Sequence, residues 1–128
     1  MQKISMLGSG FIGRFYTDSL HGYRNKDRVV SIYSRREESA KKFAKDYDVP
    51  HWTINMEESI SHKDVDVVCI SLPNNLHEEA VHLCCKHNKA VICTKPLGRT
   101  AAEAKRMVEA VEKAGIFAGY LEDLCYTP

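Results

Sequence analysis

The sequence lacks the signals that mark several specialised classes of protein. No apolar run approaches the roughly 20 residues that a helix needs to span a bilayer. The N-terminal segment has neither the length nor the cleavage site of a signal peptide. Neither sign of charge dominates, because 18 Lys and Arg balance 17 Asp and Glu for a net charge of +1. We therefore expect no membrane partner and no nucleic-acid partner, both of which favour a basic surface.

The sequence also lacks the cysteine spacing that is typical of disulfide frameworks and redox motifs. The five cysteines are Cys69, Cys84, Cys85, Cys93 and Cys125. Their number is odd, none forms a CxxC pair and three lie inside apolar runs, so we expect reduced, mostly buried thiols in a cytoplasmic protein. His82 and His87 have no carboxylate or cysteine at metal-ligand spacing, so no metal site is predicted. GxSxG, HExxH and Walker motifs are also absent.

What the 128 residues contain is an alternation of two patterns. Apolar, β-type runs are separated by stretches whose apolar residues recur at helical spacing. The predicted strands are Lys3–Leu7, Arg28–Tyr33, a weak His51–Thr53, Val65–Ser71, Ala90–Cys93 and Ile116–Leu121. Such alternation favours βαβ units and a parallel sheet with helices on both faces. We predict one α/β domain with a doubly wound, Rossmann-like sheet of about six strands in the order 3-2-1-4-5-6.

The first predicted strand runs directly into a GxGxxG motif. Its glycines are Gly8, Gly10 and Gly13, with Phe11 and Ile12 between the last two. In this context the first glycine permits a tight turn, the second lets a ligand approach the backbone and the third lets the helix pack closely. A dinucleotide pyrophosphate would then bind at the helix N-terminus. The alternative is a glycine-rich turn with no ligand.

The end of the second predicted strand bears on the choice of cofactor. An NAD site usually has an Asp or Glu about 20 residues past the glycines, where it binds the ribose hydroxyls. This sequence has Ser34, followed by Arg35 and Arg36. A hydroxyl and a guanidinium accommodate a 2′-phosphate, which a carboxylate would repel. We therefore predict NADP as the favoured cofactor, with NAD possible. The alternative, for Arg36 above all, is a solvated charge at the start of an exposed helix.

Two later loops follow predicted strands and reach the same edge of the sheet. The residues of interest are Ser71, Leu72, Pro73, Asn74 and His77 in the first loop, and Thr94 and Lys95 in the second. Pro73 ends the strand, and an Asn can cap the next helix. A lysine at a cofactor cleft donates hydrogen bonds to a substrate oxygen. From spacing alone, the alternatives are a surface or capping histidine and an exposed lysine before a turn proline.

Together, the glycine loop, the SLPNNLH segment and the TKP segment resemble the N-terminal domain of the Gfo/Idh/MocA family, across essentially the whole chain. The resemblance implies an NAD(P)-dependent oxidoreductase acting on sugars, polyols and related alcohols or imines. It implies that residues 71–77, including Asn74 and His77, line the cofactor. The family's EKP lysine lies near the nicotinamide C4, so the resemblance implies that Lys95 is the catalytic residue. Thr94 replaces a Glu that usually contacts the nicotinamide-side ribose, where a threonine can still make a hydrogen bond.

The resemblance also implies a division into domains. Residues 1–121 correspond to the dinucleotide-binding domain, and residues 122–128 to the start of a crossover into a substrate domain that this chain does not contain. We expect a truncated domain that catalyses little alone, because half of the catalytic cleft would be missing. In the family, the second domain supplies further acid–base residues and the contacts of a homo-oligomer.

Two alternatives come from other classes of function. A standalone domain would sense NADP(H) or regulate a partner without catalysis, which the short length favours. A methyltransferase-like Rossmann fold would bind S-adenosylmethionine, but such sites usually have an acidic residue where this chain has Ser34. The cofactor domain of an oxidoreductase remains the leading prediction.

Overall fold

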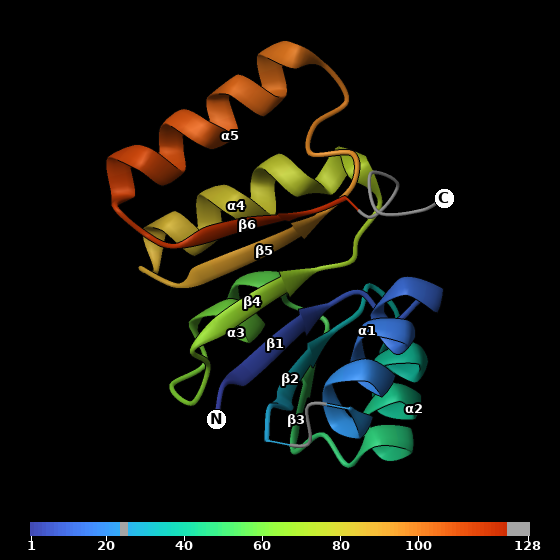
Figure 1. Cartoon of the computed structure of the whole chain (residues 1–128). Helices are drawn as coiled ribbons and strands as arrows, with labels where there is room; N and C mark the ends of the chain where they lie inside the picture. The colour runs from blue at the N-terminus through green and yellow to red at the C-terminus, as the bar shows by residue number, and fades with distance from the viewer. Residues whose placement is uncertain (24–25, 123–128) are drawn as a thin grey trace.

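A parallel sheet of six strands forms the centre of the computed structural model, which describes residues 1–23 and 26–122. The strands are β1 (Lys3–Leu7), β2 (Arg28–Tyr33), β3 (His51–Thr53), β4 (Val67–Ile70), β5 (Ala90–Thr94) and β6 (Ala118–Leu121). The helices are α1 (Phe11–Gly22), α2 (Glu37–Tyr47), α3 (Met56–Ser61), α4 (His77–Lys86) and α5 (Ala101–Ala114), with one 3-10 turn, η1 (Asn74–Leu76). The strand order β3-β2-β1-β4-β5-β6 confirms the predicted doubly wound α/β fold (Figure 1).

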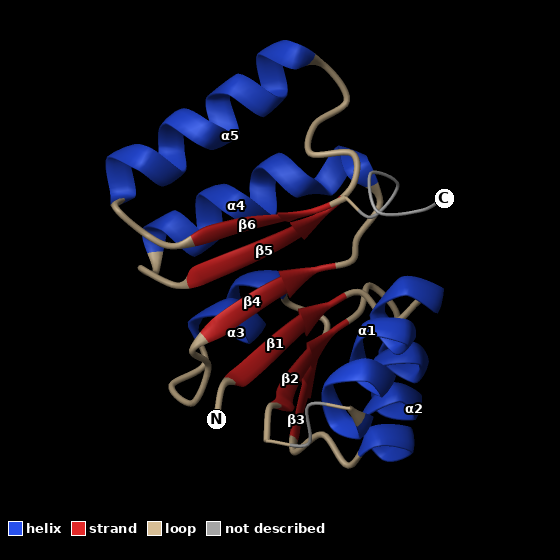
Figure 2. Cartoon of the chain, in the orientation of Figure 1, coloured by secondary structure: helices blue, strands red, loops and turns tan. Residues whose placement is uncertain are grey.

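The helices form two layers, one on each face of the sheet (Figure 2). On one face, α1 and α2 pack against β2 and β3, whereas α3, α4 and α5 lie together on the other. From β1 the chain moves outward to β2 and β3, then returns to add β4, β5 and β6 on the other side of β1. The order therefore reverses between β1 and β4, which is where ligands bind in open α/β sheets.

Two apolar clusters, one on each side of the sheet, hold the layers together. The central strands contribute to both clusters, because Val68, Cys69 and Ile70 of β4 are all buried. Consecutive apolar residues are typical of a parallel strand that is covered on both faces. Phe43 of α2 is fully buried in one cluster, and Met107 of α5 is buried in the other. This packing fixes the positions of the strand ends and of the loops that follow them.

Hydrogen bonds continue past the strand ends and align these loops. The Gly8 N–H donates to the Tyr33 carbonyl oxygen at 2.9 Å, which joins the glycine loop to the end of β2. The Ser71 N–H donates to the Leu7 carbonyl oxygen at 2.9 Å, which joins the end of β4 to the end of β1. The loops after β1, β2 and β4 therefore meet at one edge of the sheet.

Both ends of α5 carry cap residues, whereas the expected asparagine cap of α4 is wrong. The Glu103 N–H donates to the Thr100 side chain at 3.1 Å, and Gly115 ends α5 with a left-handed φ of 67°. Neither η1 nor α4 has a side-chain cap hydrogen bond, so Asn74 does not cap through its side chain. The 3-10 turn η1 leads directly into α4 instead.

The strand predictions differ from the structure mainly in length. The run predicted at Val65–Ser71 forms the shorter β4, because its first residues belong to the turn before the strand. The segment predicted as a crossover, residues 122–128, lies outside the described residues apart from Glu122. In the part of the chain that the structure describes, no helix has the length and apolar character needed to cross a bilayer.

Candidate functional site

The glycine loop is built from close contacts that only glycine allows. Gly8 has a φ of 109°, and a Cβ there would lie 2.7 Å from the Ser71 carbonyl oxygen. A Cβ on Gly13 would overlap the Gly8 carbonyl oxygen. At Gly10, by contrast, no described atom lies within 4 Å of the position that a Cβ would take. The loop is therefore closed at Gly8 and Gly13 and open at Gly10, where a ligand can approach the backbone.

Helix α1 begins directly after this opening. Among the described residues, no side chain caps its N-terminus and no acidic side chain lies in its first turn. The first N–H groups of a helix have no partner within the helix, and the helix dipole favours an anion beside them. The residues present at Gly10, Phe11 and Ile12 therefore fit the pyrophosphate of a dinucleotide.

A hollow of about 420 Å³ lies beside the glycine loop, at the ends of β1, β2 and β4. Most of the predicted cofactor-binding residues line it: Gly8, Gly10, Phe11, Ile12, Ser34, Arg35, Arg36, Ser71, Leu72 and Pro73. The other lining residues, which the sequence analysis does not predict, are Ser9, Tyr33, Ser39 and Leu76. The predicted residues outside this lining are Gly13, Asn74, His77, Thr94 and Lys95. The structure thus brings the first three predicted segments together and sets the β5 loop apart.

The end of β2 presents hydroxyls and cations to this hollow. Ser9 Oγ donates a hydrogen bond to Ser34 Oγ at 2.9 Å, and Ser34 is buried. Arg35 and Arg36 are exposed. Ser9 occupies a variable position of the GxGxxG motif, so the motif gives no signal for its role. Hydroxyls therefore stand where an NAD site usually has a carboxylate.

Ser71 supports the glycine loop through its side chain. Its Oγ donates to the Leu7 carbonyl oxygen at 2.8 Å and lies 3.2 Å from the Gly8 carbonyl oxygen. The hydroxyl is therefore engaged with the backbone of the loop that faces the hollow. Next to it, Leu72 is half-buried and Pro73 is exposed, and both add apolar surface to the lining.

His77 lies between two loops, rather than on the surface of the hollow where the family resemblance implies it. The residue is only 1% exposed. Its Nδ1 lies 2.9 Å from the Pro96 carbonyl oxygen and 3.1 Å from that of Leu97. Its Nε2 lies 2.9 Å from the Leu72 carbonyl oxygen. The alternative of a surface or capping histidine is therefore wrong, because the ring joins the loop after β4 to the loop after β5.

Thr94 and Lys95 adjoin at the end of β5 but differ in exposure. Thr94 is buried, and its Oγ1 lies 3.0 Å from the hydroxyl of Tyr16 on α1. The Thr94 hydroxyl is thus engaged within the protein, by a tyrosine that the sequence analysis does not single out. Lys95 is exposed, at the edge of the sheet where the other loops meet. Of the two side chains, Lys95 is the one that solvent and a bound molecule can reach.

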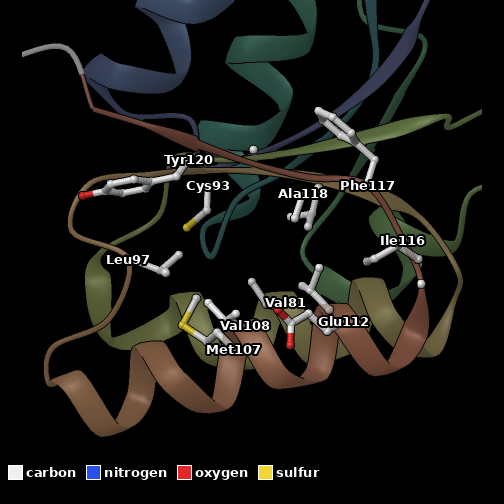
Figure 3. A pocket seen from close by; sticks show the side chains of 14 residues that line it. Val81, Cys93, Leu97, Met107, Val108, Glu112, Ile116, Phe117, Ala118 and Tyr120 are labelled. Atoms are coloured by element: carbon white, nitrogen blue, oxygen red, sulfur yellow. The ribbon is translucent and has the colours of Figure 1, made fainter.

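A larger hollow, of about 580 Å³, lies between α5 and the sheet edge at β5 and β6 (Figure 3). Side chains that point toward it include Val81 of α4, Cys93 of β5 and Met107 of α5. Its lining is mostly apolar, and its one charged member, Glu112, is a carboxylate. A dinucleotide needs cations or N–H groups for its phosphates. A dinucleotide therefore fits the smaller hollow beside the glycine loop better than this one.

The described cysteines are free thiols, and most are buried. Burial raises the pKa of Cys69, Cys84 and Cys93 to about 12, so these thiols are neutral at ordinary pH and poor nucleophiles. Cys125 lies outside the described residues. Within residues 1–23 and 26–122, no three His, Cys, Asp or Glu side chains are grouped so that they could hold a metal ion. The site chemistry therefore rests on the glycine loop, the end of β2 and the two later loops.

These features define the class of protein. An open α/β sheet with a glycine loop after β1, an uncapped α1 and a hollow where the strand order reverses is a dinucleotide-binding domain. The sequence narrows this class to one family. The chain belongs to the Gfo/Idh/MocA family, an oxidoreductase family with an NAD-binding Rossmann fold, whose model matches residues 2–120. The resemblance seen in the sequence motifs is therefore confirmed.

Individual relatives agree with this assignment. The chain is similar to a trans-1,2-dihydrobenzene-1,2-diol dehydrogenase of Bos taurus, with 35% identity over 113 residues, or 88% of this chain and 34% of that protein. The chain thus spans about a third of the length of this curated relative.

Two solved structures share the fold. A WlbA dehydrogenase from Chromobacterium violaceum, in complex with NADH and UDP-GlcNAcA, has a TM-score of 0.87 and 17% identity, covering 94% of this chain and 34% of that one. A biliverdin reductase from Synechocystis sp. PCC 6803, in complex with biliverdin and NADP+, has a TM-score of 0.82 and 22% identity, covering 92% of this chain and 37% of that one.

Proposed function

We propose that this chain is the cofactor domain of an oxidoreductase that prefers NADP(H) to NAD(H). The observation that carries the preference is the end of β2, where Ser34 stands in place of a carboxylate and accepts a hydrogen bond from Ser9 at 2.9 Å. A carboxylate at this position binds the ribose hydroxyls of NAD and repels a 2′-phosphate. Two hydroxyls in its place remove the repulsion.

Positive charge at the same position supports binding of the 2′-phosphate. Arg35 and Arg36 are exposed and line the hollow, and Ser39 in the first turn of α2 lines it too. Guanidinium groups bind phosphate through paired hydrogen bonds. Glu37 and Glu38, in the first turn of α2, do not line the hollow, and Glu37 forms an ion pair with Lys41 at 2.6 Å. The charges that line the hollow at this position are therefore those of the two arginines, which favour an anion.

The remaining parts of a dinucleotide match the rest of the hollow. The N–H groups at the start of α1, after the opening at Gly10, would hold the pyrophosphate. Leu72 and Pro73 would form an apolar wall beside the sugar and ring groups. A nicotinamide directed toward the end of β5 would then lie near the loop that carries Lys95.

We propose Lys95 as the catalytic residue and a small hydroxyl-bearing or carbonyl compound, such as a sugar or polyol, as the substrate. A bound nicotinamide cofactor supplies or accepts the hydride. The Lys95 ammonium, exposed at this edge, donates a hydrogen bond to the substrate oxygen and stabilises the negative charge that develops there. The name of the Bos taurus relative, a diol dehydrogenase, supports this substrate class.

Titration of the chain with NADPH and, separately, with NADH tests the cofactor assignment, with nicotinamide fluorescence or calorimetry as the readout. We expect NADPH to bind at least about tenfold more tightly, as one charged hydrogen-bonding contact would give, and Arg35→Ala to remove most of the difference. Lys105→Ala is the matched control, because Lys105 is an exposed cation on α5, away from the hollow.

The outcomes separate the two parts of the proposal. Tighter binding of NADH, or an Arg35→Ala variant that keeps the full preference, overturns the preference for NADP(H). Absence of binding for both nucleotides overturns the cofactor role of the chain.

A further inference from the structure

His77 lies between the two loops that frame the proposed cofactor and substrate positions. The first loop contributes Leu72 to the wall of the hollow, and the second directly follows Lys95. The ring contacts both, since Nε2 lies 2.9 Å from the Leu72 carbonyl oxygen and Nδ1 lies 2.9 Å from that of Pro96. A second oxygen, that of Leu97, lies 3.1 Å from Nδ1. One buried side chain thus joins two segments that are distant in the sequence.

All three of these oxygens belong to peptide carbonyls, which accept hydrogen bonds and cannot donate them. A neutral imidazole carries a proton on one nitrogen only, so it donates to one loop and turns a lone pair toward a carbonyl of the other. An imidazolium carries protons on both nitrogens and donates to both loops at once. In either state the ring donates to at least one of the two loops and lies between the carbonyl oxygens of both.

The titratable side chains near His77 leave its contacts with the carbonyl oxygens in place. Cys93 of β5 has its Sγ 3.4 Å from Nδ1, and burial raises the pKa of this thiol to about 12, so it is uncharged. Glu78, the next residue in α4, is held by Arg106 of α5 at 2.6 Å. Glu103 of α5 is held by Arg99 at 2.5 Å. Both carboxylates are thus engaged with arginines, and the ring nitrogens contact the three carbonyl oxygens and the Cys93 thiol.

We propose that His77 is a positioning residue that ties the loop of Lys95 to the wall of the cofactor hollow. The bonded carbonyls at Pro96 and Leu97 belong to the two residues after Lys95, so the ring restrains the backbone from which the lysine projects. The functional role of Lys95 rests on the proposed function, whereas the tie itself does not.

Hydrogen exchange of the full 128-residue chain, read by mass spectrometry, tests the tie. In the wild type, peptides covering residues 70–76 and 95–99 should be protected, after correction for intrinsic exchange. His77→Gln has an amide that donates from one end only. It should lose about tenfold protection in at least one of these peptides. Peptides from β2 and α2 should exchange alike in both proteins.

His82→Gln is the matched control. It makes the same change on the same helix. The His82 side chain is half exposed, and its Nε2 lies 3.6 Å from a carboxylate oxygen of Glu78. Both loops should therefore exchange as in the wild type. A uniform rise in exchange across His77→Gln, or loop protection in this variant equal to that of the wild type, overturns the proposal. If His77→Gln does not fold, His77→Asn takes its place, with the same loss of loop protection expected.

The NADPH titration of the same proteins separates this proposal from the proposed function. Loss of loop protection in His77→Gln, together with a wild type that binds no NADPH, contradicts the cofactor role and supports the tie. NADPH binding by the wild type, together with unchanged loop protection in His77→Gln, does the reverse.

Discussion

Gly13 packs directly onto the main-chain carbonyl of Gly8, so closely that a β-carbon at position 13 would overlap the carbonyl oxygen. Gly13→Ala should therefore lower the free energy of unfolding by about 1–3 kcal/mol, the usual range for an overpacked buried site. Gly10→Ala should change it by less than about 0.5 kcal/mol, since the space around Gly10 is open. Urea unfolding of the two variants and the wild type measures both values.

The same pair of variants separates stability from binding. Gly10→Ala should fold normally yet bind NADPH at least about tenfold more weakly, because its methyl group would occupy the opening where the pyrophosphate approaches. Fluorescence titration measures this loss. A Gly10→Ala variant that binds as the wild type does would show that the cofactor does not cross the loop at this residue.

Ser34→Asp should reverse the preference between the two cofactors. The new carboxylate would accept the hydrogen bond from Ser9 and would face the 2′-phosphate, so NADPH affinity should fall by about 10–100-fold while NADH affinity rises. Ser34→Asn has nearly the same size without the charge, and it should not improve NADH binding. Dissociation constants for both nucleotides test this prediction. A Ser34→Asp variant that still prefers NADPH would place the 2′-phosphate away from the end of β2.

The parts of the fold that could be predicted are those with local patterns. The GxGxxG loop and the apolar run of β4 each reveal their element within a few residues. Helix α3 escapes prediction because it has only six residues, too few to show a helical period. Its start depends on a single cap, in which the Glu58 N–H donates to the Asn55 side chain at 3.1 Å.

The parts of the site that could not be predicted depend on packing between distant segments. The bond from Ser9 to Ser34 joins the glycine loop to β2, and neither residue alone signals a partner. His77 looks like an ordinary residue at a helix start, because its burial is created by the loop after β5 folding over it. Sequence reasoning therefore finds the segments of the site but not the contacts that hold them together.

His21 should make the stability of the chain depend on pH. Its Nε2 accepts a hydrogen bond from the Val29 N–H at 3.0 Å, and burial, followed by the charge of Arg28, lowers its pKa. Below the usual histidine value of about 6.5, the unfolded chain takes up a proton that the folded chain resists. The free energy of unfolding should therefore fall between about pH 7 and about pH 5, in part because protonation of His21 breaks its hydrogen bond with Val29.

Urea unfolding at the two pH values, on the wild type and His21→Gln, isolates this contribution. A glutamine oxygen can accept from Val29 at either pH, so the variant should lose less stability on acidification. Burial also lowers the pKa of His62, so part of the dependence should remain. Asp46 and Glu57 have lowered pKa values and titrate below this window. An equal loss of stability in His21→Gln and the wild type would contradict the prediction.

Lys95→Met should separate catalysis from cofactor binding. The substitution removes the charge while keeping a side chain of similar length, and Lys95 lies outside the lining of the cofactor hollow. NADPH affinity should therefore change by less than about threefold. Turnover of the oxidoreductase that contains this domain should fall by about 10²–10⁴-fold, as expected when the donor to a reacting oxygen is lost. The measurements are a fluorescence titration and the rate of nicotinamide absorbance change with sugar or polyol substrates.

Lys105→Met, on the exposed face of α5, controls for the loss of one positive charge and should leave both quantities unchanged. If NADPH affinity and turnover fell together in Lys95→Met, the lysine would bind the cofactor and would not act on the substrate oxygen. If neither changed, Lys95 would have no part in the reaction. Only a selective fall in turnover fits a cation that is exposed at the end of β5, outside the hollow proposed for the cofactor.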